Sequence, residues 1–562
     1  MALPAFAGLG SIAVDRPVQP GEALDLTDRG SIPRPGTATT ETWPRLRPGD
    51  VAATLASMMI VAVVAAPRLA PGVCFGDSGG LQLAAATLGI THPPGYPGYA
   101  TLGYVAGLLP GVTPARAVTL LFLLAGLGVL GLGVLVQIRM GVGAWTAAAI
   151  MLVFTLHKRL WPNLIVPEVY LPTLALLAGT CYLLMRYAHR GGRGTLVVAA
   201  GLFGLALGNR PPVVLFLPFL VVALILAERQ LRRARWSWTR SLALCGMVAL
   251  GPWLYSLAYL WARDDPNAAY NYLAQYDREF PDLPDADDGW VAKAQRVYWE
   301  ASAAQFRAAM GNDWAGVKAR LRWAARQLGN LSIPSLEPIV QFSAVLSFVL
   351  ILLGLAWVVT WTREPVGALL ILGLGLHALV FVCAYQVLGQ AADLLPLLFS
   401  AAVLGGVAGS VVLMRAGGRA SRATEFVLFL ASAGGVAALL PRVLTPSWSH
   451  DAEPFLQSVD VATLPANAVI CTGWGEATAL WYDQHVTTGR TDLLILNADE
   501  SRWLQLAGSP DERPVFYSHR EAPAGDCTLV PFRNLWRVEC PPAGTGRAPG
   551  STPALEPPQA SN

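Results

Sequence analysis

Residues 51–97 read VAATLASMMIVAVVAAPRLAPGVCFGDSGGLQLAAATLGITHPPGYP, and this stretch decides the class of fold. Its first part is apolar and uncharged as far as Pro67, which is long enough for a helix to cross the ~30 Å hydrocarbon layer of a membrane. The rest of the segment 70–114 is interrupted by prolines, which end helices early. We therefore predict a membrane span followed by short helices at the outer membrane surface. The prolines are Pro93, Pro94, Pro97 and Pro110.

The composition of the whole chain is that of a membrane protein. Of the 562 residues, 54% are hydrophobic and only 14% are charged, and the mean hydropathy is +0.46, whereas about 25% of the residues in soluble domains are charged. The small net charge of +3 does not indicate nucleic acid as a partner. Residues 1–48 are polar and proline-rich, so we predict a disordered cytoplasmic tail. The apolar run that follows begins too far along the chain for a cleaved signal peptide and should remain as an anchor.

About eleven apolar runs have the length of a membrane span, so residues 49–441 are predicted to form an α-helical, polytopic transmembrane domain. The fifth and sixth runs are also compatible with one broken unit, because Pro211 and Pro212 end a helix between them. The runs lie near residues 50–69, 115–137, 141–157, 165–186, 194–209, 212–227, 240–261, 338–361, 366–388, 393–414 and 424–441.

The basic residues predict how the chain is oriented. Clusters occur in RLRPGD before the first run, in RYAHRGGRG after the fourth, in ERQLRRARWSWTR after the sixth and in RAGGRASR after the tenth. All four clusters lie on the cytoplasmic side if the N-terminus is cytoplasmic and the chain crosses eleven times, as the positive-inside rule requires. Residues 70–114, the loop HKRLWPNLIVPEVY, residues 262–337 and everything after Pro441 then lie outside. We expect the protein in a bacterial plasma membrane.

The region after the last run is predicted to be a small extracytoplasmic α/β domain, residues 442–540. AVICTG and TDLLIL read as strands around a helical EATALWYDQHV, followed by a strand in RPVFYS and a hairpin in CTLVPFRNLWRVEC. In an oxidising compartment Cys527 and Cys540 of that hairpin are able to pair. Residues 541–562 are rich in proline and glycine and are predicted to be disordered.

The cysteine spacing and the short motifs of the chain indicate neither a metal site nor a cofactor. The seven cysteines have no CxxC spacing, so neither a zinc site nor a redox motif is predicted. GDSGG, residues 76–80, spells the nucleophile loop of trypsin-like proteases. Those enzymes need a histidine and an aspartate before the serine in chain order, but the first histidine of this chain is His92, after Ser78. Ser78 is therefore not predicted to be a nucleophile.

Asp77, next to Ser78, is the stronger catalytic candidate, because a carboxylate in an outer loop can deprotonate an acceptor hydroxyl. A lipid-linked donor keeps its tail in the bilayer while its phosphate emerges at the outer surface. Cations that bind the phosphate should therefore lie in outer loops. Lys158, Arg159 and Arg210 are basic residues on the predicted outer side, against the positive-inside pattern. Binding of phosphate by these residues is one interpretation, and snorkelling of each side chain to water is the other.

Two further residues on the predicted outer side are candidate site residues, and each also has a purely structural interpretation. Glu168, in VPEVY, is a second carboxylate, and it serves either the site or the start of a helix. His92, in THPPGY, either binds substrate or closes a turn.

Long motifs in these segments resemble a known family. GDSGGLQLAAATLGITHPPGYPG follows the first run as the pattern GDSGEL…LGIAHPPGYPL follows the first span of that family. VPEVYLPTLALLAG resembles its EVY segment, GLALGNRPPVVLFLP its GLSLTNH segment, and ALWYDQHVTTGRTDLLILN its PLWYLQEVEGIRPDV segment. The family comprises membrane glycosyltransferases of the GT-C superfamily, in the group that includes the O-mannosyltransferase acting on plexin and receptor-kinase ectodomains. The resemblance covers roughly residues 50–510.

The resemblance implies a GT-C fold and the transfer of a sugar, mannose or a similar hexose, from a polyprenyl-phosphate donor to an acceptor at the outer face. The acceptor is a protein hydroxyl or a glycan. Asp77 takes the place of the general base, and inversion at the anomeric carbon is usual. Tyr96, Tyr170 and Asn209 lie within the resembling segments and join His92, Lys158, Arg159, Glu168 and Arg210 in the expected set of donor- and substrate-binding residues.

The chain departs from the family pattern at three places. Gly80 replaces the glutamate after GDSG, Arg210 replaces the histidine after TN, and GWGEAT, with Glu476, replaces GDNDT. The first change either shifts the handling of the acceptor to Glu168 or removes a site role, and the second suits a stronger phosphate clamp. None of the three changes removes Asp77.

Two other classes of function stay open from the sequence. A flippase or transporter of lipid-linked glycans would carry ionisable residues near the membrane midplane and repeated halves, whereas the apolar runs are nearly free of charge. A non-catalytic scaffold that binds partners through its outer domain is the third class.

Overall fold

The structure is a computed structural model, and its described helices and strands all lie in one compact unit, residues 45–562. It describes Trp43, residues 45–231, 237–265, Ala268, 270–273, 283–284, 289–311, 314–328, 343–385, 391–414, 418–443, 451–497, 513–519 and 527–539. Of the expected N-terminal tail 1–48, residues 1–42 and Pro44 lie outside the described residues, as does the whole expected tail 541–562. So does Cys540, although Cys527 itself is disulfide-bonded.

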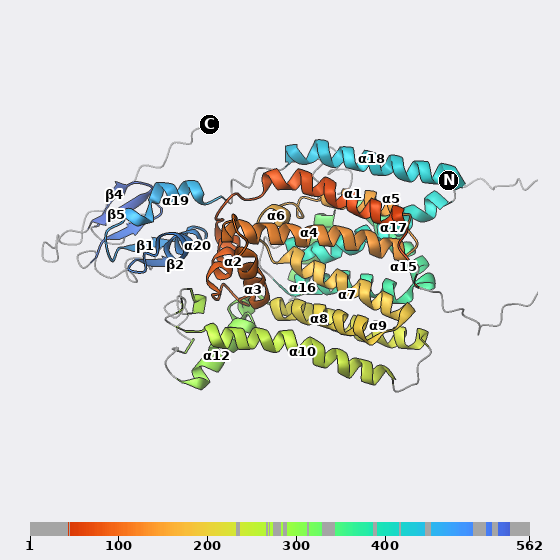
Figure 1. The fold of residues 1–562 in the computed structure, drawn as a ribbon, viewed down its shortest axis with the longest axis horizontal. Helices are drawn as coiled ribbons and strands as arrows, with labels where there is room; N and C mark the ends of the chain where they lie inside the picture. The colour runs from red at the N-terminus through yellow and green to blue at the C-terminus, as the bar shows by residue number, and fades with distance from the viewer. Residues whose placement is uncertain are drawn as a thin grey trace, which may run out of the picture. The chain divides into compact units, whose positions relative to one another are not determined.

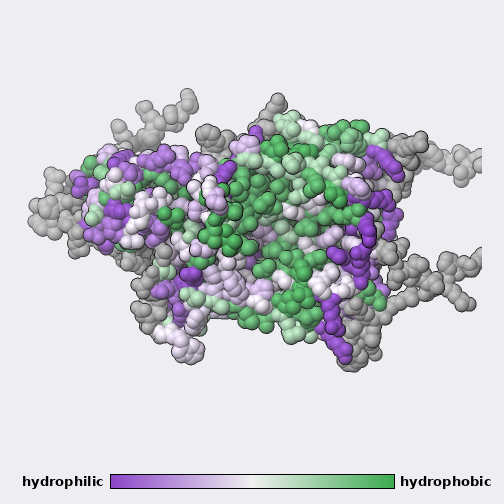
Figure 2. All heavy atoms as spheres, in the orientation of Figure 1, coloured by the Kyte–Doolittle hydropathy of each residue, from purple (hydrophilic) through white to green (hydrophobic). Residues whose placement is uncertain are grey.

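A bundle of apolar helices makes up most of the described chain (Figure 1). Seven of the described helices are long and apolar enough to cross a membrane. Figure 2 shows apolar side chains in a band across the bundle and hydrophilic side chains towards both ends, as in a multi-pass membrane protein. The bundle contains α1 (Pro48–Ala65), α4 (Pro114–Arg139), α5 (Ala144–Thr155), α7 (Tyr170–Arg190), α8 (Arg193–Asn209), α9 (Leu217–Gln230), α10 (Ser237–Arg263), α15 (Ser343–Arg363), α16 (Pro365–Ala384), α17 (Leu395–Met414) and α18 (Gly418–Val443).

A helix therefore lies in each of the eleven ranges that the sequence predicts, but the count of eleven membrane crossings stays a prediction. Two of the helices, α5 and α8, are short. The expected fourth span also begins later than predicted, at Tyr170. Pro167 disfavours helical geometry in the residue before it, so α6 (Pro162–Ile165) ends first and the segment with Glu168 remains outside the helix.

Close helix packing in the bundle depends on small residues. A Cβ atom on Gly204 of α8 would lie 2.4 Å from the carbonyl oxygen of Ala249 in α10. Only glycine allows the two backbones to approach so closely, which is a common device between membrane helices.

Short helices connect the ends of the bundle helices on the side of the candidate site. Helix α2 is largely buried, whereas α3 exposes Leu102, Tyr104 and Val105, which fits a helix at the membrane surface. The expected outer segment 262–337 contributes further helices to this region. The short elements are η1 (Ala66–Arg68), α2 (Gly76–Thr87), α3 (Pro97–Gly107), η2 (Pro211–Phe216), α12 (Trp290–Ala301), η3 (Ala304–Ala309), α13 (Trp314–Leu328) and η4 (Ala391–Leu394).

The C-terminal part forms a five-stranded sheet in the order β2-β1-β3-β5-β4. The first three strands of that order are parallel, and β5 pairs antiparallel with β3 and β4. The strands fall in the segments predicted from the sequence, and α20 connects β1 to β2. The elements are α19 (Glu453–Val459), η6 (Val461–Thr463), β1 (Val469–Thr472), α20 (Trp474–Tyr482), η7 (Asp483–Thr488), β2 (Leu494–Asn497), β3 (Val515–Tyr517), β4 (Thr528–Phe532) and β5 (Leu535–Glu539).

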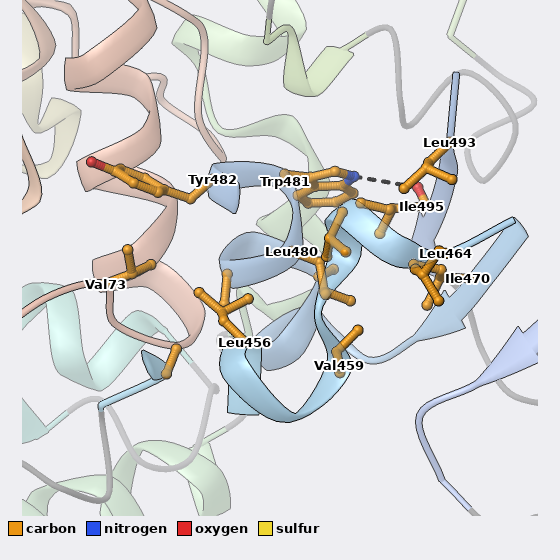
Figure 3. Close-up of a cluster of buried hydrophobic side chains, with 14 of the residues drawn as sticks. Val73, Leu456, Val459, Leu464, Ile470, Leu480, Trp481, Tyr482, Leu493 and Ile495 are labelled. Atoms are coloured by element: carbon orange, nitrogen blue, oxygen red, sulfur yellow. Dashed lines mark hydrogen bonds between the residues drawn. The ribbon is translucent and has the colours of Figure 1, made fainter. Parts of the chain in front are cut away.

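The hydrophobic core of this sheet is continuous with the segment that follows α1 and with the start of α4. Val73, Leu83 and Ala115 belong to the same buried cluster as the side chains of α19, α20 and the strands. Figure 3 shows Val73 and Tyr482 in this cluster, and Trp481 donating a hydrogen bond to the backbone at Ile495. The C-terminal part thus packs directly on α2 through shared apolar burial, which is the main source of stability at such a contact.

Candidate functional site

A cavity of about 410 Å³ lies where the short elements α2, η2 and η3 meet the bundle. Its walls come from segments far apart in the sequence, and they combine charged groups with apolar side chains. Such a lining suits a ligand that has both a polar and an apolar part. The polar and aromatic lining residues are Asp77, His92, Tyr96, Glu168, Tyr170, Arg210, Ser302, Phe306, Arg307, Phe381 and Tyr385.

Asp77 lies in the first turn of α2, where the helix dipole favours a negative charge. Its Oδ1 accepts a hydrogen bond of 2.7 Å from the indole Nε1 of Trp474. Its Oδ2 lies 3.8 Å from Nε2 of His92, and the Asp77 side chain is about half exposed, at 48%. The carboxylate is therefore oriented from two sides while it remains accessible from the cavity.

The segment from His92 to Tyr96 forms one wall beside Asp77. Nδ1 of His92 lies 3.2 Å from the hydroxyl of Thr91, and the His92 ring contacts the ring of Tyr96 with centroids 5.2 Å apart. The Tyr96 ring in turn stacks on Tyr99 of α3. These contacts hold the imidazole facing the carboxylate.

Glu168 also lines the cavity. It accepts a hydrogen bond of 3.2 Å from the hydroxyl of Ser78 in α2. Burial, with a further contribution from the negative charge of Asp77, raises the pKa of Glu168 from 4.5 to about 8. Glu168 is therefore protonated at neutral pH and able to donate a hydrogen bond to a ligand oxygen. A buried carboxyl group with a raised pKa is typical of catalytic sites.

This pKa predicts how stability depends on pH. The folded protein holds the Glu168 proton more tightly than the unfolded chain does, so its stability should fall as the pH rises from about 5 to about 8. The Glu168→Gln variant should lose less thermal stability over that range than the wild type, measured in detergent by thermal unfolding. Glu539→Gln, at an exposed side chain in β5, is the control and should behave as the wild type. An unchanged slope in Glu168→Gln would contradict the raised pKa.

Arg210 stands at the end of α8, directly before Pro211 and Pro212 of η2. Its guanidinium forms an ion pair and a hydrogen bond with Asp393 and lies 4.6 Å from the centre of the Tyr170 ring. Because Asp393 is buried, this pair holds the arginine in one geometry. The carboxylate also neutralises part of the charge that Arg210 presents to the cavity.

Arg307 is a second guanidinium at the cavity, and sequence reasoning missed it. Its Nη2 donates to the hydroxyls of Tyr298 at 2.9 Å and of Ser302 at 3.1 Å, and no carboxylate pairs with it among the described residues. Arg307 lies in η3, within a long polar segment where one arginine among many carries no recognisable motif. Met310 and Tyr385 bridge η3 to the end of α16, a contact that no local pattern predicts.

The cavity brings together six of the nine residues that the sequence predicts, which are Asp77, His92, Tyr96, Glu168, Tyr170 and Arg210. In the part of the chain that the structure describes, Lys158, Arg159 and Asn209 are not among the lining residues. Asn209 accepts a hydrogen bond from the backbone N–H of Tyr99, so it supports the start of α3 beside the site. Phosphate binding by Lys158 and Arg159 stays a prediction.

Within the described ranges, no group of three or more His, Cys, Asp or Glu side chains is arranged to hold a metal ion. The cavity instead contains two carboxyl groups, those of Asp77 and Glu168, and two guanidinium groups, those of Arg210 and Arg307. This set is able to bind an anionic ligand and to accept a proton next to it.

Comparison with known proteins identifies part of this region. Residues 77–233 match the family model described as the protein O-mannosyl-transferase TMEM260 N-terminal domain. The matched segment begins at Asp77 and contains Glu168 and Arg210, so the resemblance found in the sequence is confirmed there and places this segment in a glycosyltransferase family. The chain matches none of the curated proteins.

Two solved proteins are similar in structure. ArnT from Cupriavidus metallidurans, bound to undecaprenyl phosphate, has 15% identity and a TM-score of 0.49 over 87% of this chain and 97% of its own; its apo state has 14% identity and a TM-score of 0.45 over 87% and 98%. The Archaeoglobus fulgidus oligosaccharyltransferase, in complex with Zn and sulfate, has 11% identity and a TM-score of 0.47 over 83% of this chain and 68% of its own.

Proposed function

We propose that this protein is a membrane glycosyltransferase that moves a sugar, mannose or a similar hexose, from a polyprenyl-phosphate donor to an acceptor hydroxyl of a protein or a glycan. One observation carries the proposal. A single cavity contains a carboxylate, Asp77, and two guanidinium groups, Arg210 and Arg307, next to apolar walls. The match of residues 77–233 to a protein O-mannosyl-transferase domain supports the same reaction class.

The cavity suits both parts of such a donor. Guanidinium groups bind phosphate oxygens through parallel N–H groups, and Arg210 and Arg307 approach the cavity from different segments. Val214, Leu215 and Phe381 supply apolar surface beside them, where the first isoprene units of a lipid tail find a non-aqueous environment. Protonated Glu168 adds a hydrogen-bond donor for a sugar or phosphate oxygen.

The charged groups of the cavity and His92 each have a role in the proposed reaction. The acceptor oxygen forms a bond to the anomeric carbon while the bond from that carbon to the phosphate oxygen breaks. Asp77 takes the proton of the acceptor hydroxyl, and the leaving group is the polyprenyl phosphate, whose negative charge Arg210 and Arg307 stabilise. His92, facing the Asp77 carboxylate at 3.8 Å, helps to orient that carboxylate.

Arg307 should contribute to donor binding in particular. Its Nη2 donates to the hydroxyls of Tyr298 and Ser302, and among the described residues no carboxylate pairs with it. We expect Arg307→Ala to raise the donor KM by roughly tenfold or more, with a smaller change in kcat, since a hydrogen bond to a charged group is worth about 1.5–3 kcal/mol. Lys318→Ala is the matched control, because Lys318 lies on the neighbouring α13 against Trp314. A donor KM equal in Arg307→Ala and wild type would remove Arg307 from the site.

The proposal is tested in membranes that contain the protein. Radiolabelled polyprenyl-phosphate mannose is added with cell-envelope extract, and label is followed into protein-bound and water-soluble products. Time-dependent transfer that requires the protein is the expected result. If no label moves from this donor or from a panel of other polyprenyl-phosphate sugars, the proposed reaction is wrong. Movement of an intact lipid-linked sugar across the vesicle membrane without transfer would instead support a flippase.

A further inference from the structure

Trp474, in α20 of the C-terminal part, donates a hydrogen bond to the candidate base Asp77 and packs against three other rings. Its Nε1 lies 2.7 Å from Oδ1 of Asp77. The indole ring also contacts the rings of His92, Tyr272 and Trp481 at centroid distances of 5.8, 5.5 and 6.1 Å. A ring held by three neighbours has little freedom to rotate, so its N–H direction is set by packing.

The helix that carries Asp77 leaves room for this indole. A Cβ atom on Gly80 would lie 3.7 Å from Cζ2 of Trp474 and 2.8 Å from the hydroxyl of Thr91. A longer side chain at position 80 would therefore compete with the indole for space. A Cβ on Gly79 would meet the backbone carbonyl of Cys74 first, and also the hydroxyl of Thr478 of α20 at 2.9 Å. The last two glycines of GDSGG thus serve packing, and at Gly79 part of that packing is against α20.

From this geometry we propose that Trp474 is a positioning residue for Asp77 and that the C-terminal part thereby completes the active site. The indole N–H holds Oδ1, which leaves Oδ2 to face the acceptor. In the transfer step the acceptor proton moves to Oδ2 as the acceptor oxygen bonds to the anomeric carbon and the phosphate leaves. This inference rests on the proposed function.

An N–H donor on a carboxylate stabilises its ionised form. Without the indole N–H, Asp77 should therefore hold its proton to higher pH and spend less time in the productive orientation. The titratable groups that face Asp77 are His92, Glu168, Tyr96 and Tyr385, with the guanidinium groups of Arg210 and Arg307 in the same cavity. Trp474→Phe alters none of these groups chemically. A shift of the acid limb of the kcat–pH profile in Trp474→Phe is therefore assigned to the loss of the indole N–H.

The test compares Trp474→Phe with Trp357→Phe. Both variants remove an indole N–H, but that of Trp357 in α15 bonds to the carbonyl of Ala368 in α16 at 3.0 Å. In Trp474→Phe we expect kcat at neutral pH to fall about 10- to 100-fold, the acid limb of the kcat–pH profile to move to higher pH, and the donor KM to change less than about twofold. Trp357→Phe should leave the acid limb where it is in the wild type.

A second measurement is independent of turnover. With ¹⁵N-labelled tryptophan in detergent micelles, the indole signal that disappears in Trp474→Phe should titrate with pH in the wild type. The same signal should not titrate in this way in Asp77→Asn. An indole signal insensitive to Asp77→Asn, or a Trp474→Phe variant with the kcat and acid limb of the wild type, would overturn the positioning role. If the wild type itself transfers no sugar from any donor, the proposed function fails and this catalytic role fails with it, whatever the indole signal shows.

Discussion

Asp77→Asn should abolish measurable sugar transfer, with kcat lower by about 10²- to 10⁴-fold, the range that a general base contributes. The amide has nearly the same shape as the carboxylate, and its oxygen is still able to accept the hydrogen bond from Trp474. It is unable to take the proton of the acceptor hydroxyl. Because the Asp77 side chain is about half exposed, folding should be unaffected. Transfer in membranes and the thermal unfolding of the purified protein are the two measurements.

The control for this variant is Asp265→Asn, at an exposed carboxylate of the outer segment that is not among the cavity-lining residues in the described chain. It should retain full activity. If Asp77→Asn keeps activity within a few-fold of the wild type, Asp77 is not the base. The remaining carboxyl group of the cavity, Glu168, would then be the first group to examine.

Arg210→Met should have the second largest effect, because it acts on two properties at once. Removing the guanidinium takes one cation from the proposed phosphate site, so the donor KM should rise by about tenfold or more. It also leaves Asp393 buried without its partner, and breaking a buried ion pair in this way costs about 3–5 kcal/mol. The thermal stability in detergent should therefore fall together with donor affinity.

The double variant Arg210→Met/Asp393→Leu separates the two effects. Replacing both partners of a buried pair by apolar residues is often neutral or stabilising, so the stability should return towards that of the wild type. The donor KM should stay high, because the cation is still missing. A double variant with the donor KM of the wild type would show that Arg210 serves only the structure.

The positions of the helices and the main catalytic candidate could be predicted from the sequence, because both depend on local properties. A membrane span shows itself as an uninterrupted apolar run, and prolines show where such runs end. Asp77 was recognisable because it lies inside a long motif directly after the first run. The strands of the C-terminal sheet were likewise predictable from short apolar segments with polar neighbours.

The partners of these residues depend on how the helices pack, and no local pattern encodes that. Asp393, which pairs with Arg210, lies 183 positions away in the chain, and Trp474, which holds Asp77, lies 397 positions away. Arg307 reaches the cavity only because η3 packs against the end of α16. Hydropathy and motifs are properties of neighbouring residues, whereas ion pairs and buried hydrogen bonds arise where distant segments exclude water together. The sequence alone therefore determined the spans and the candidate base, and only the tertiary structure decided which groups surround that base.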